Sequence, residues 1–287
     1  MNGYPRAELI ATPEWLAENL PRPGFQVLDV RWRPDGSGKR AYGAGHIPGA
    51  SYLDWQADLA EPDEDGDVFQ IAGPTRLTAA MARSGLGNGM IGVLYDDTAG
   101  AYAAWAWWTL RVYGMESTRI LNGGVDSWLA AARPMSGGQE LRPPAIFTPH
   151  LEARRQVTAS EVRDMIGSQT VQIIDARTES EYLGHAGTSR RLGHIPGAIN
   201  VPSAAATASG SGCFRQPDEL RALLRGAQVD QRRRLVCYDS AGPGAAKLAF
   251  VLCLMGYEDI AVYSGGWAEW GDRLDLPVER LAGGSLR

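Results

Sequence analysis

Residues 45–50 read GHIPGA, and the same six letters return at residues 193–198. Three further blocks recur around this hexapeptide, in the same order and at nearly the same offset. The paired blocks are VLDVR at 27–31 with IIDAR at 173–177, GVLYD at 92–96 with LVCYD at 235–239, and LNGGVDSW at 121–128 with YSGGWAEW at 263–270. Chance does not preserve the order of such blocks, so the chain consists of two copies of one domain.

Each copy alternates short apolar stretches with longer helical ones, and residues 101–112 and 245–255 are apolar almost throughout. Helices of that kind pack against a sheet, and strand–helix alternation is typical of parallel sheets. We therefore expect an α/β fold of two tandem domains, each a mostly parallel sheet with helices on both faces. The expected boundaries are 1–138 for the N-terminal domain, 139–156 for a linker, and 157–287 for the C-terminal domain.

The composition is that of an ordinary globular protein and excludes several classes of function. A net charge of -5 without a dominant basic face argues against nucleic-acid binding, and no apolar run is long enough to span a membrane. The cysteines Cys213, Cys237 and Cys253 are too widely spaced for a disulfide framework or a structural zinc site. Nucleotide-binding, metalloprotease and esterase motifs are absent. We expect a cytoplasmic protein without cofactor or metal.

The repeated blocks resemble those of the tandem-domain rhodaneses, the thiosulfate and 3-mercaptopyruvate sulfurtransferases. The resemblance rests on DAR followed by Glu181-Tyr182, on GHIPGA, and on GGWxxW, in both halves and over nearly the whole chain. It implies two rhodanese-like domains that face each other, with an active site at their interface carried mainly by the C-terminal copy. It also implies a small anionic substrate, such as thiosulfate or mercaptopyruvate, and a loop cysteine that takes up sulfur as a persulfide.

The C-terminal loop departs from this pattern. Aligning VCYDSAG at 236–242 with the family places Asp239 at the nucleophile, and Cys237 falls two residues earlier, inside a strand. Ala241 stands where the mercaptopyruvate branch keeps a serine. The N-terminal copy has Asp96 at the equivalent position, as the catalytically silent domains of the family do. The C-terminal loop therefore resembles the silent type.

Two accounts of Asp239 remain open. Its carboxylate accepts the N–H groups of its own loop and caps the following helix near Pro243, or it is a general base or nucleophile with Ser240 beside it. Sulfur transfer by Cys237 requires the loop to shift by two residues; otherwise Cys237 is a small apolar strand residue. The candidate catalytic residues are thus Asp239, Cys237 and Ser240.

The resemblance implies that Arg177 and Arg191 bind the substrate, because a guanidinium pairs well with carboxylate or sulfonate oxygens. The alternatives are a salt bridge from Arg177 to Glu179 or Glu181, and a surface role for Arg191, as for its neighbour Arg190. The other candidate substrate-binding residues are Ala241, Gly242, Pro243, Gly244 and His46.

His46 has two possible roles. It either fixes its turn by bonding to backbone or, as the resemblance implies, relays a proton with a nearby acid, for which Asp35 is the nearest upstream candidate.

Three functions follow from these residues. The first is a sulfurtransferase-like enzyme acting on a small anion at the inter-domain pocket, with weak or altered chemistry because of Asp239. The second is an enzyme of another class, a hydrolase or lyase that uses Asp239. The third is a pseudoenzyme that binds a ligand or partner. The family resemblance favours the first.

Overall fold

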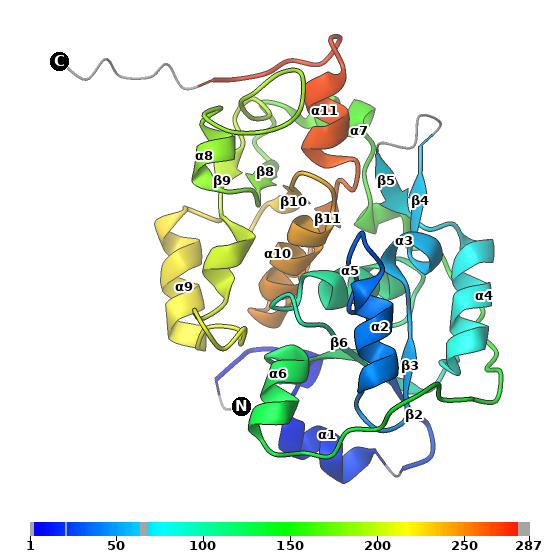
Figure 1. Cartoon of the computed structure of the whole chain (residues 1–287). Helices are drawn as coiled ribbons and strands as arrows, with labels where there is room; N and C mark the ends of the chain where they lie inside the picture. The colour runs from blue at the N-terminus through cyan, green and yellow to red at the C-terminus, as the bar shows by residue number, and fades with distance from the viewer. Residues whose placement is uncertain (1–2, 21, 64–67, 281–287) are drawn as a thin grey trace.

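The computed structural model describes residues 3–20, 22–63 and 68–280, and Figure 1 shows the whole chain. The N-terminal domain is built on a five-stranded sheet in the order β1-β7-β6-β2-β3, in which every neighbouring pair is parallel. The strands are β1 (Ile10–Ala11), β2 (Phe25–Asp29), β3 (Ala50–Tyr52), β6 (Ile91–Tyr95) and β7 (Thr118–Leu121). A separate antiparallel pair, β4 (Ala60–Pro62) and β5 (Phe69–Ile71), lies between β3 and β6 in the sequence.

The C-terminal domain repeats this plan with a four-stranded parallel sheet in the order β11-β10-β8-β9. Its strands are β8 (Val171–Asp175), β9 (Ile199–Asn200), β10 (Arg234–Tyr238) and β11 (Ile260–Val262). Two parallel-sheet domains in tandem confirm the fold class expected from the repeated blocks.

Helices cover both faces of each sheet, as Figure 1 shows. The N-terminal helices are α1 (Pro13–Asn19), α2 (Ser37–Ala44), α3 (Trp55–Asp58), α4 (Pro74–Ser84), α5 (Ala101–Val112) and α6 (Gly124–Ala130). The C-terminal helices are α7 (Ala159–Met165), α8 (Glu179–Tyr182), α9 (Pro217–Gly226), α10 (Pro243–Leu254) and α11 (Gly266–Asp272). Short 3₁₀ turns occur at η1 (Ala7–Leu9), η2 (Ala153–Arg155) and η3 (Ser203–Ala206).

The two domains share one hydrophobic core. Helices α5 and α10 are buried over nearly their whole length and pack against each other at the centre of the molecule. Phe250 of α10 meets the ring of Trp107 of α5 edge to face, with 4.9 Å between ring centroids, and Phe214 at 5.0 Å. Helices that are apolar on all sides bury more surface in the middle of a protein than at its edge. This pair therefore holds the domains together.

The segment 139–156 runs along the N-terminal domain before the chain enters the second sheet. Arg142 donates to the carbonyl of Gly49 at 2.6 Å, and the amide of Glu152 donates to the carbonyl of Val112 at 2.7 Å. The amide of Val157 then donates to the carbonyl of Val262 in β11 at 3.2 Å. The segment is thus fixed to the first domain by the side chain of Arg142 and by its own backbone.

In the part of the chain that the structure describes, none of the helices combines the length and apolarity that a membrane span requires.

Replacing Phe250 by Ala should lower the free energy of unfolding by about 3–5 kcal/mol, because the side chain is fully buried between the domains. Urea denaturation followed by tryptophan fluorescence measures the change. Leu274→Ala is the control, because Leu274 is 76% exposed, and its change should stay within about 0.5 kcal/mol. Equal effects of the two substitutions would contradict a shared core at Phe250.

Candidate functional site

The loop that joins β10 to α10 closes on its own aspartate. Asp239 follows the last residue of β10, and its carboxylate accepts the backbone N–H of Gly242 through Oδ1 and that of Gly244 through Oδ2, the latter at 2.8 Å. Gly242 has φ = 105°, and a Cβ there would lie 1.8 Å from Cζ3 of Trp105 in α5. Only glycine combines a positive φ with the absence of a Cβ, so the contact with Trp105 of the N-terminal domain restricts the shape of this loop.

The other candidate residues of this loop are Pro243, Ala241 and Ser240. Pro243 is the first residue of α10, where its missing N–H costs nothing. Ala241 is partly buried, and Ser240 is exposed. The hydrogen bonding of Asp239 is what the capping account expects.

The N-terminal domain also has an aspartate that accepts N–H groups of its own loop. Asp96 follows β6, and its carboxylate accepts the N–H groups of Thr98, Gly100 and Ala103 at 3.0, 2.9 and 3.0 Å. Asp96 is almost fully buried, whereas Asp239 remains partly exposed. The two loops therefore share one architecture but differ in their access to solvent.

Burial raises the pKa of Asp239 to about 6, although the N–H groups of Gly242 and Gly244 favour its charged form. The nearby charge of Asp175 contributes to this rise. A carboxyl group with such a pKa exchanges its proton close to neutral pH, which a general acid or base requires. The acid–base account of Asp239 therefore has a physical basis.

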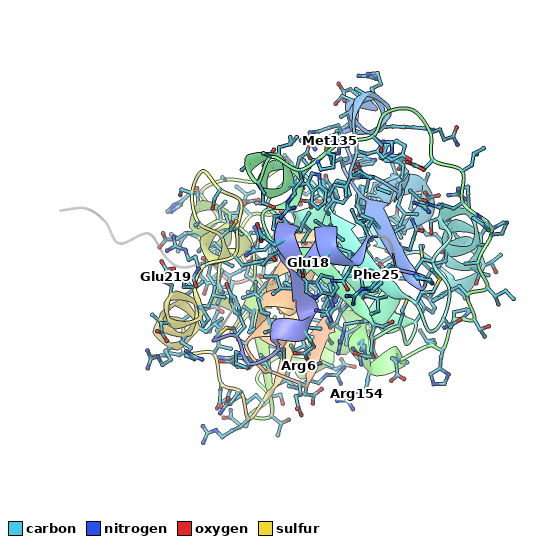
Figure 2. The ribbon with its side chains drawn as sticks, turned by 90° about the horizontal axis from the view of Figure 1, so that it is seen from below. Arg6, Glu18, Phe25, Met135, Arg154 and Glu219 are labelled. Carbon is cyan, nitrogen blue, oxygen red and sulfur yellow. The ribbon has the colours of Figure 1, made fainter. Side chains whose placement is uncertain are left out.

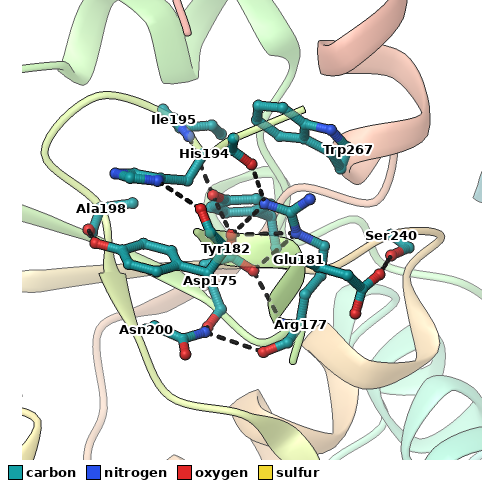
Figure 3. Close-up of polar contacts among 12 residues, drawn as sticks. Asp175, Arg177, Glu181, Tyr182, His194, Ile195, Ala198, Asn200, Ser240 and Trp267 are labelled. Atoms are coloured by element: carbon teal, nitrogen blue, oxygen red, sulfur yellow. Dashed lines mark hydrogen bonds and ion pairs between the residues drawn. The ribbon is translucent and has the colours of Figure 1, made fainter. Parts of the chain in front are cut away.

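A cavity of about 190 Å³ lies beside Asp239. Its lining comes entirely from the C-terminal domain: Ala176, Arg177, Thr178, Glu181, Pro202, Ser203, Ala204, Asp239 and Ser240. Figure 3 shows Ser240 donating to Glu181, with 3.1 Å between Oγ and Oε1. Burial opposes ionisation of Glu181, but hydrogen bonds from Thr178 and Ser240 lower its pKa. Two carboxyl groups thus line this cavity.

Arg177 also lines the cavity, but its guanidinium is hydrogen-bonded to other residues of the C-terminal domain (Figure 3). Its Nε and Nη2 donate to the carboxylate of Asp175 at 3.0 and 2.6 Å, and Nη2 donates to the carbonyl of Gly193 at 2.7 Å. The group also stacks on Trp267, 4.3 Å from the ring centre. The ion pair of Arg177 is therefore with Asp175, and not with Glu179 or Glu181, which were the alternative to substrate binding.

The N-terminal domain has an equivalent arginine with equivalent contacts. Arg31 donates to Asp29 at 2.6 Å and to the carbonyl of Gly45 at 2.7 Å. In both domains a tyrosine at the end of the neighbouring strand in the sheet donates to this aspartate at 2.6 Å. Tyr95 donates to Asp29, and Tyr238 donates to Asp175. A contact present in both copies holds the fold together. The repeated blocks VLDVR and IIDAR indicate this in the sequence, because the Asp and Arg recur in both domains.

Arg191 lies against the end of α11 rather than beside Asp239. Its guanidinium donates to the carbonyls of Gly271, Leu276 and Trp270 at 3.2, 2.7 and 2.9 Å, and also to that of Arg273. A cation at a helix C-terminus is favourable, because it faces carbonyl groups that lack a partner in the helix. The contacts of Arg191 are therefore those of a capping residue.

His46 is fully buried within its turn in the N-terminal domain. Its ring stacks on Tyr42, and Nδ1 lies 2.9 Å from the carbonyl oxygen of Tyr42. The acid nearest to Nε2 is Glu140 at 3.6 Å, and not Asp35, whose carboxylate accepts the N–H of Ser37 at 2.9 Å. These contacts fix the turn, as the backbone alternative expects.

The three thiols lie outside the loop cavity. Cys237 is fully buried within β10, and burial raises the pKa of its thiol well above the ordinary value. Cys253 is buried near the end of α10, where burial raises the pKa of its thiol to about 11. Cys213 is partly exposed, but it lies against Gly123 of the N-terminal domain. Cys237 therefore has the contacts of an apolar strand residue.

Comparisons with known proteins agree with this architecture. The family model described as "Rhodanese-like domain" matches residues 12–131 and 158–273. The thiosulfate sulfurtransferase of Bos taurus is 30% identical, over 92% of this chain and 92% of its own length. The 3-mercaptopyruvate sulfurtransferase of Escherichia coli K12 is 31% identical, over 93% and 96%.

A solved structure has the same fold over nearly the whole chain. The crystal structure of the 3-mercaptopyruvate sulfurtransferase SseA from Escherichia coli superimposes with a TM-score of 0.79 and 29% identity. The match covers 90% of this chain and 98% of SseA. Since both halves match the family model and the relatives align over nearly their full length, this chain belongs to the rhodanese family of sulfurtransferases.

Proposed function

We propose that this member of the rhodanese family does not carry sulfur on its C-terminal loop, and that Asp239 instead performs acid–base chemistry on a small ligand in the adjoining cavity. The observation that supports this proposal is the carboxylate of Asp239 bound to the N–H groups of Gly242 and Gly244. Those N–H groups are the ones that a sulfur anion at this position would need.

Sulfur transfer by a persulfide requires a thiolate that can reach the donor. Cys237 is two residues from Asp239, but its thiol is fully buried and resists ionisation. A carboxylate cannot replace it, because it forms no stable bond to sulfane sulfur. We therefore expect sulfur transfer at this loop to be far weaker than in the thiosulfate and mercaptopyruvate sulfurtransferases to which the chain is similar.

The lining of the cavity bears on the charge of its ligand. Asp239 and Glu181 contribute carboxyl groups, whereas the positive charge of Arg177 is balanced by Asp175. An acidic cavity favours a ligand that offers a cation or hydrogen-bond donors. This argues for a small amine or neutral molecule at Asp239 rather than an anion, and for a proton-transfer step of the kind that hydrolases and lyases use.

A purely binding role, in which Asp239 only stabilises its loop, is the second candidate. Asp96 also accepts N–H groups of its own loop and is almost completely shielded from solvent, so a carboxylate at this position can serve the loop alone. The partial exposure of Asp239 and its pKa of about 6 favour the catalytic role over this alternative.

Wild-type protein treated with thiosulfate and then cyanide should release no thiocyanate above background, and Asp239→Cys should gain release. A thiolate at residue 239 would attack the outer sulfur of thiosulfate, expel sulfite, and pass the sulfur to cyanide. Ser240→Cys is the matched control, because its thiol lies outside the N–H groups of the loop, and it should gain little. Thiocyanate release by the wild type that is lost in Cys237→Ser would contradict the proposal.

The pKa of Asp239 should be measurable by carboxyl-carbon NMR, with Asp239→Asn identifying the signal. We expect a midpoint near 6, and small amines should lower it because a bound cation favours the charged carboxylate. A midpoint near 4, or a midpoint that carboxylates raise and amines leave unchanged, would refute the acid–base assignment.

The same shift makes stability depend on pH. Because folding raises the pKa of Asp239 from about 4 to about 6, the protonated group stabilises the fold below pH 4, and this contribution is lost as pH rises through 6. Relative to Asp239→Asn, the wild type should lose up to about 3 kcal/mol of unfolding free energy between pH 4 and pH 7. Urea denaturation across this range measures the difference, and a flat difference would contradict the shift.

A further inference from the structure

A second cavity, of about 360 Å³, lies at the opposite ends of the two central helices. Trp108 and Arg111 of α5 and Cys253 of α10 form its inner wall, and Arg6, Glu116 and Arg155 lie around them. Figure 2 shows the same face of the molecule, with Arg6 and Arg154 labelled. Asp239 lies before the first turn of α10, so the length of a 12-residue helix, about 18 Å, separates the two cavities.

Three arginines from distant parts of the chain converge here. Arg6 precedes η1, Arg111 is in the last turn of α5, and Arg155 ends η2. Burial lowers the pKa of Arg111, and the charges of Arg155 and Arg6 lower it further. The carboxylates of Glu8 and Glu116 offset part of this repulsion, and Glu152 and Glu258 also line the cavity.

The inner wall has hydrogen-bond donors without acceptors. Arg111 is only 8% exposed and Trp108 only 1%, and neither Nε of Arg111 nor Nε1 of Trp108 has a hydrogen-bond partner among the described residues. The guanidinium of Arg111 stacks on Trp107, 4.9 Å from the ring centre, which fixes its position. A buried N–H donor that lacks an acceptor is costly, and an oxyanion in the cavity would remove that cost.

Glu116 marks where such an oxyanion would bind. Its carboxylate bridges Nη1 of Arg111 and Nη2 of Arg155, the latter at 2.5 Å. Half of the Glu116 side chain is exposed, so this carboxylate can leave without unfolding the core. Arg154, which is mostly exposed, is paired with Asp259 at 3.2 Å and stands at the rim.

We propose that this cavity binds a small doubly charged oxyanion of the sulfate or phosphate type. Its oxygens replace the carboxylate of Glu116 on Arg111 and Arg155, and Arg6, which pairs with Glu8, lies beside them. Arginine suits such a ligand because its planar group binds two oxygens at once. The site is separate from Asp239, so this protein binds anions at the far ends of α5 and α10 and not at its loop.

Isothermal titration of the full-length protein with sulfate, thiosulfate and phosphate, at constant ionic strength, tests the proposal. We expect one anion per chain. Arg155→Gln should weaken binding at least tenfold, and Glu116→Gln should tighten it severalfold because the competing carboxylate is gone. Arg163→Gln is the matched control, since Arg163 is exposed on α7 and pairs with its neighbours Asp164 and Ser160, and this variant should bind as the wild type does.

Thermal melts of each variant establish that it is folded, and Arg6→Gln provides a second test at the rim if Arg155→Gln is unstable. The order of affinities among the three anions distinguishes a sulfur oxyanion from phosphate. Three results would overturn the proposal: no binding at millimolar anion, equal weakening by Arg155→Gln and Arg163→Gln, or weaker binding by Glu116→Gln.

Discussion

The buried ion pair between Asp175 and Arg177 is the interaction on which the C-terminal domain depends. It joins the end of β8 to the GHIPGA turn through the carbonyl of Gly193, and Tyr238 attaches the next strand to the same carboxylate. A charge pair removed from water stabilises a fold only when its remaining hydrogen bonds are satisfied, and here the backbone and a tyrosine satisfy them. The N-terminal domain keeps the same arrangement with Asp29 and Arg31.

This pair also decides what the neighbouring cavity can hold. An arginine whose charge is matched by a buried aspartate contributes little attraction to a ligand, so the carboxyl groups of Asp239 and Glu181 determine the electrostatics there. The opposite situation holds at the other end of α5 and α10. There the half-exposed Glu116 is the counter-charge that pairs with the buried Arg111. The two central helices thus separate a cavity with two carboxyl groups from one that is lined by four arginines and three glutamates.

The fold could be predicted from the sequence because its signals are local and repeated. The paired blocks identified the duplication, and the apolar stretches at 101–112 and 245–255 identified the two central helices. The position of Cys237 inside a strand followed from the same pattern, as did the hydrogen bonding of Asp239 to its loop under one of the two accounts.

The sites could be predicted only in part, because side-chain partners depend on contacts distant in sequence. Nothing near Arg191 in the sequence indicates that it reaches the carbonyls of 270–276. Nε2 of His46 lies near the carboxylate of Glu140, in the segment 139–156, and not near that of the upstream Asp35. In the cavity at the far ends of α5 and α10, Arg6, Arg111 and Arg155 come from three separate segments of the chain, and no sequence motif joins them.

Gly242 has a consequence for any attempt to take the protein apart. A Cβ at this position would lie 1.8 Å from the indole of Trp105 in the N-terminal domain, so that domain limits the shape of the turn that positions Asp239. A C-terminal half made alone would lose this contact together with the core that α10 shares with α5. The site at Asp239 therefore depends on both halves of the chain, although the residues that line its cavity all come from one.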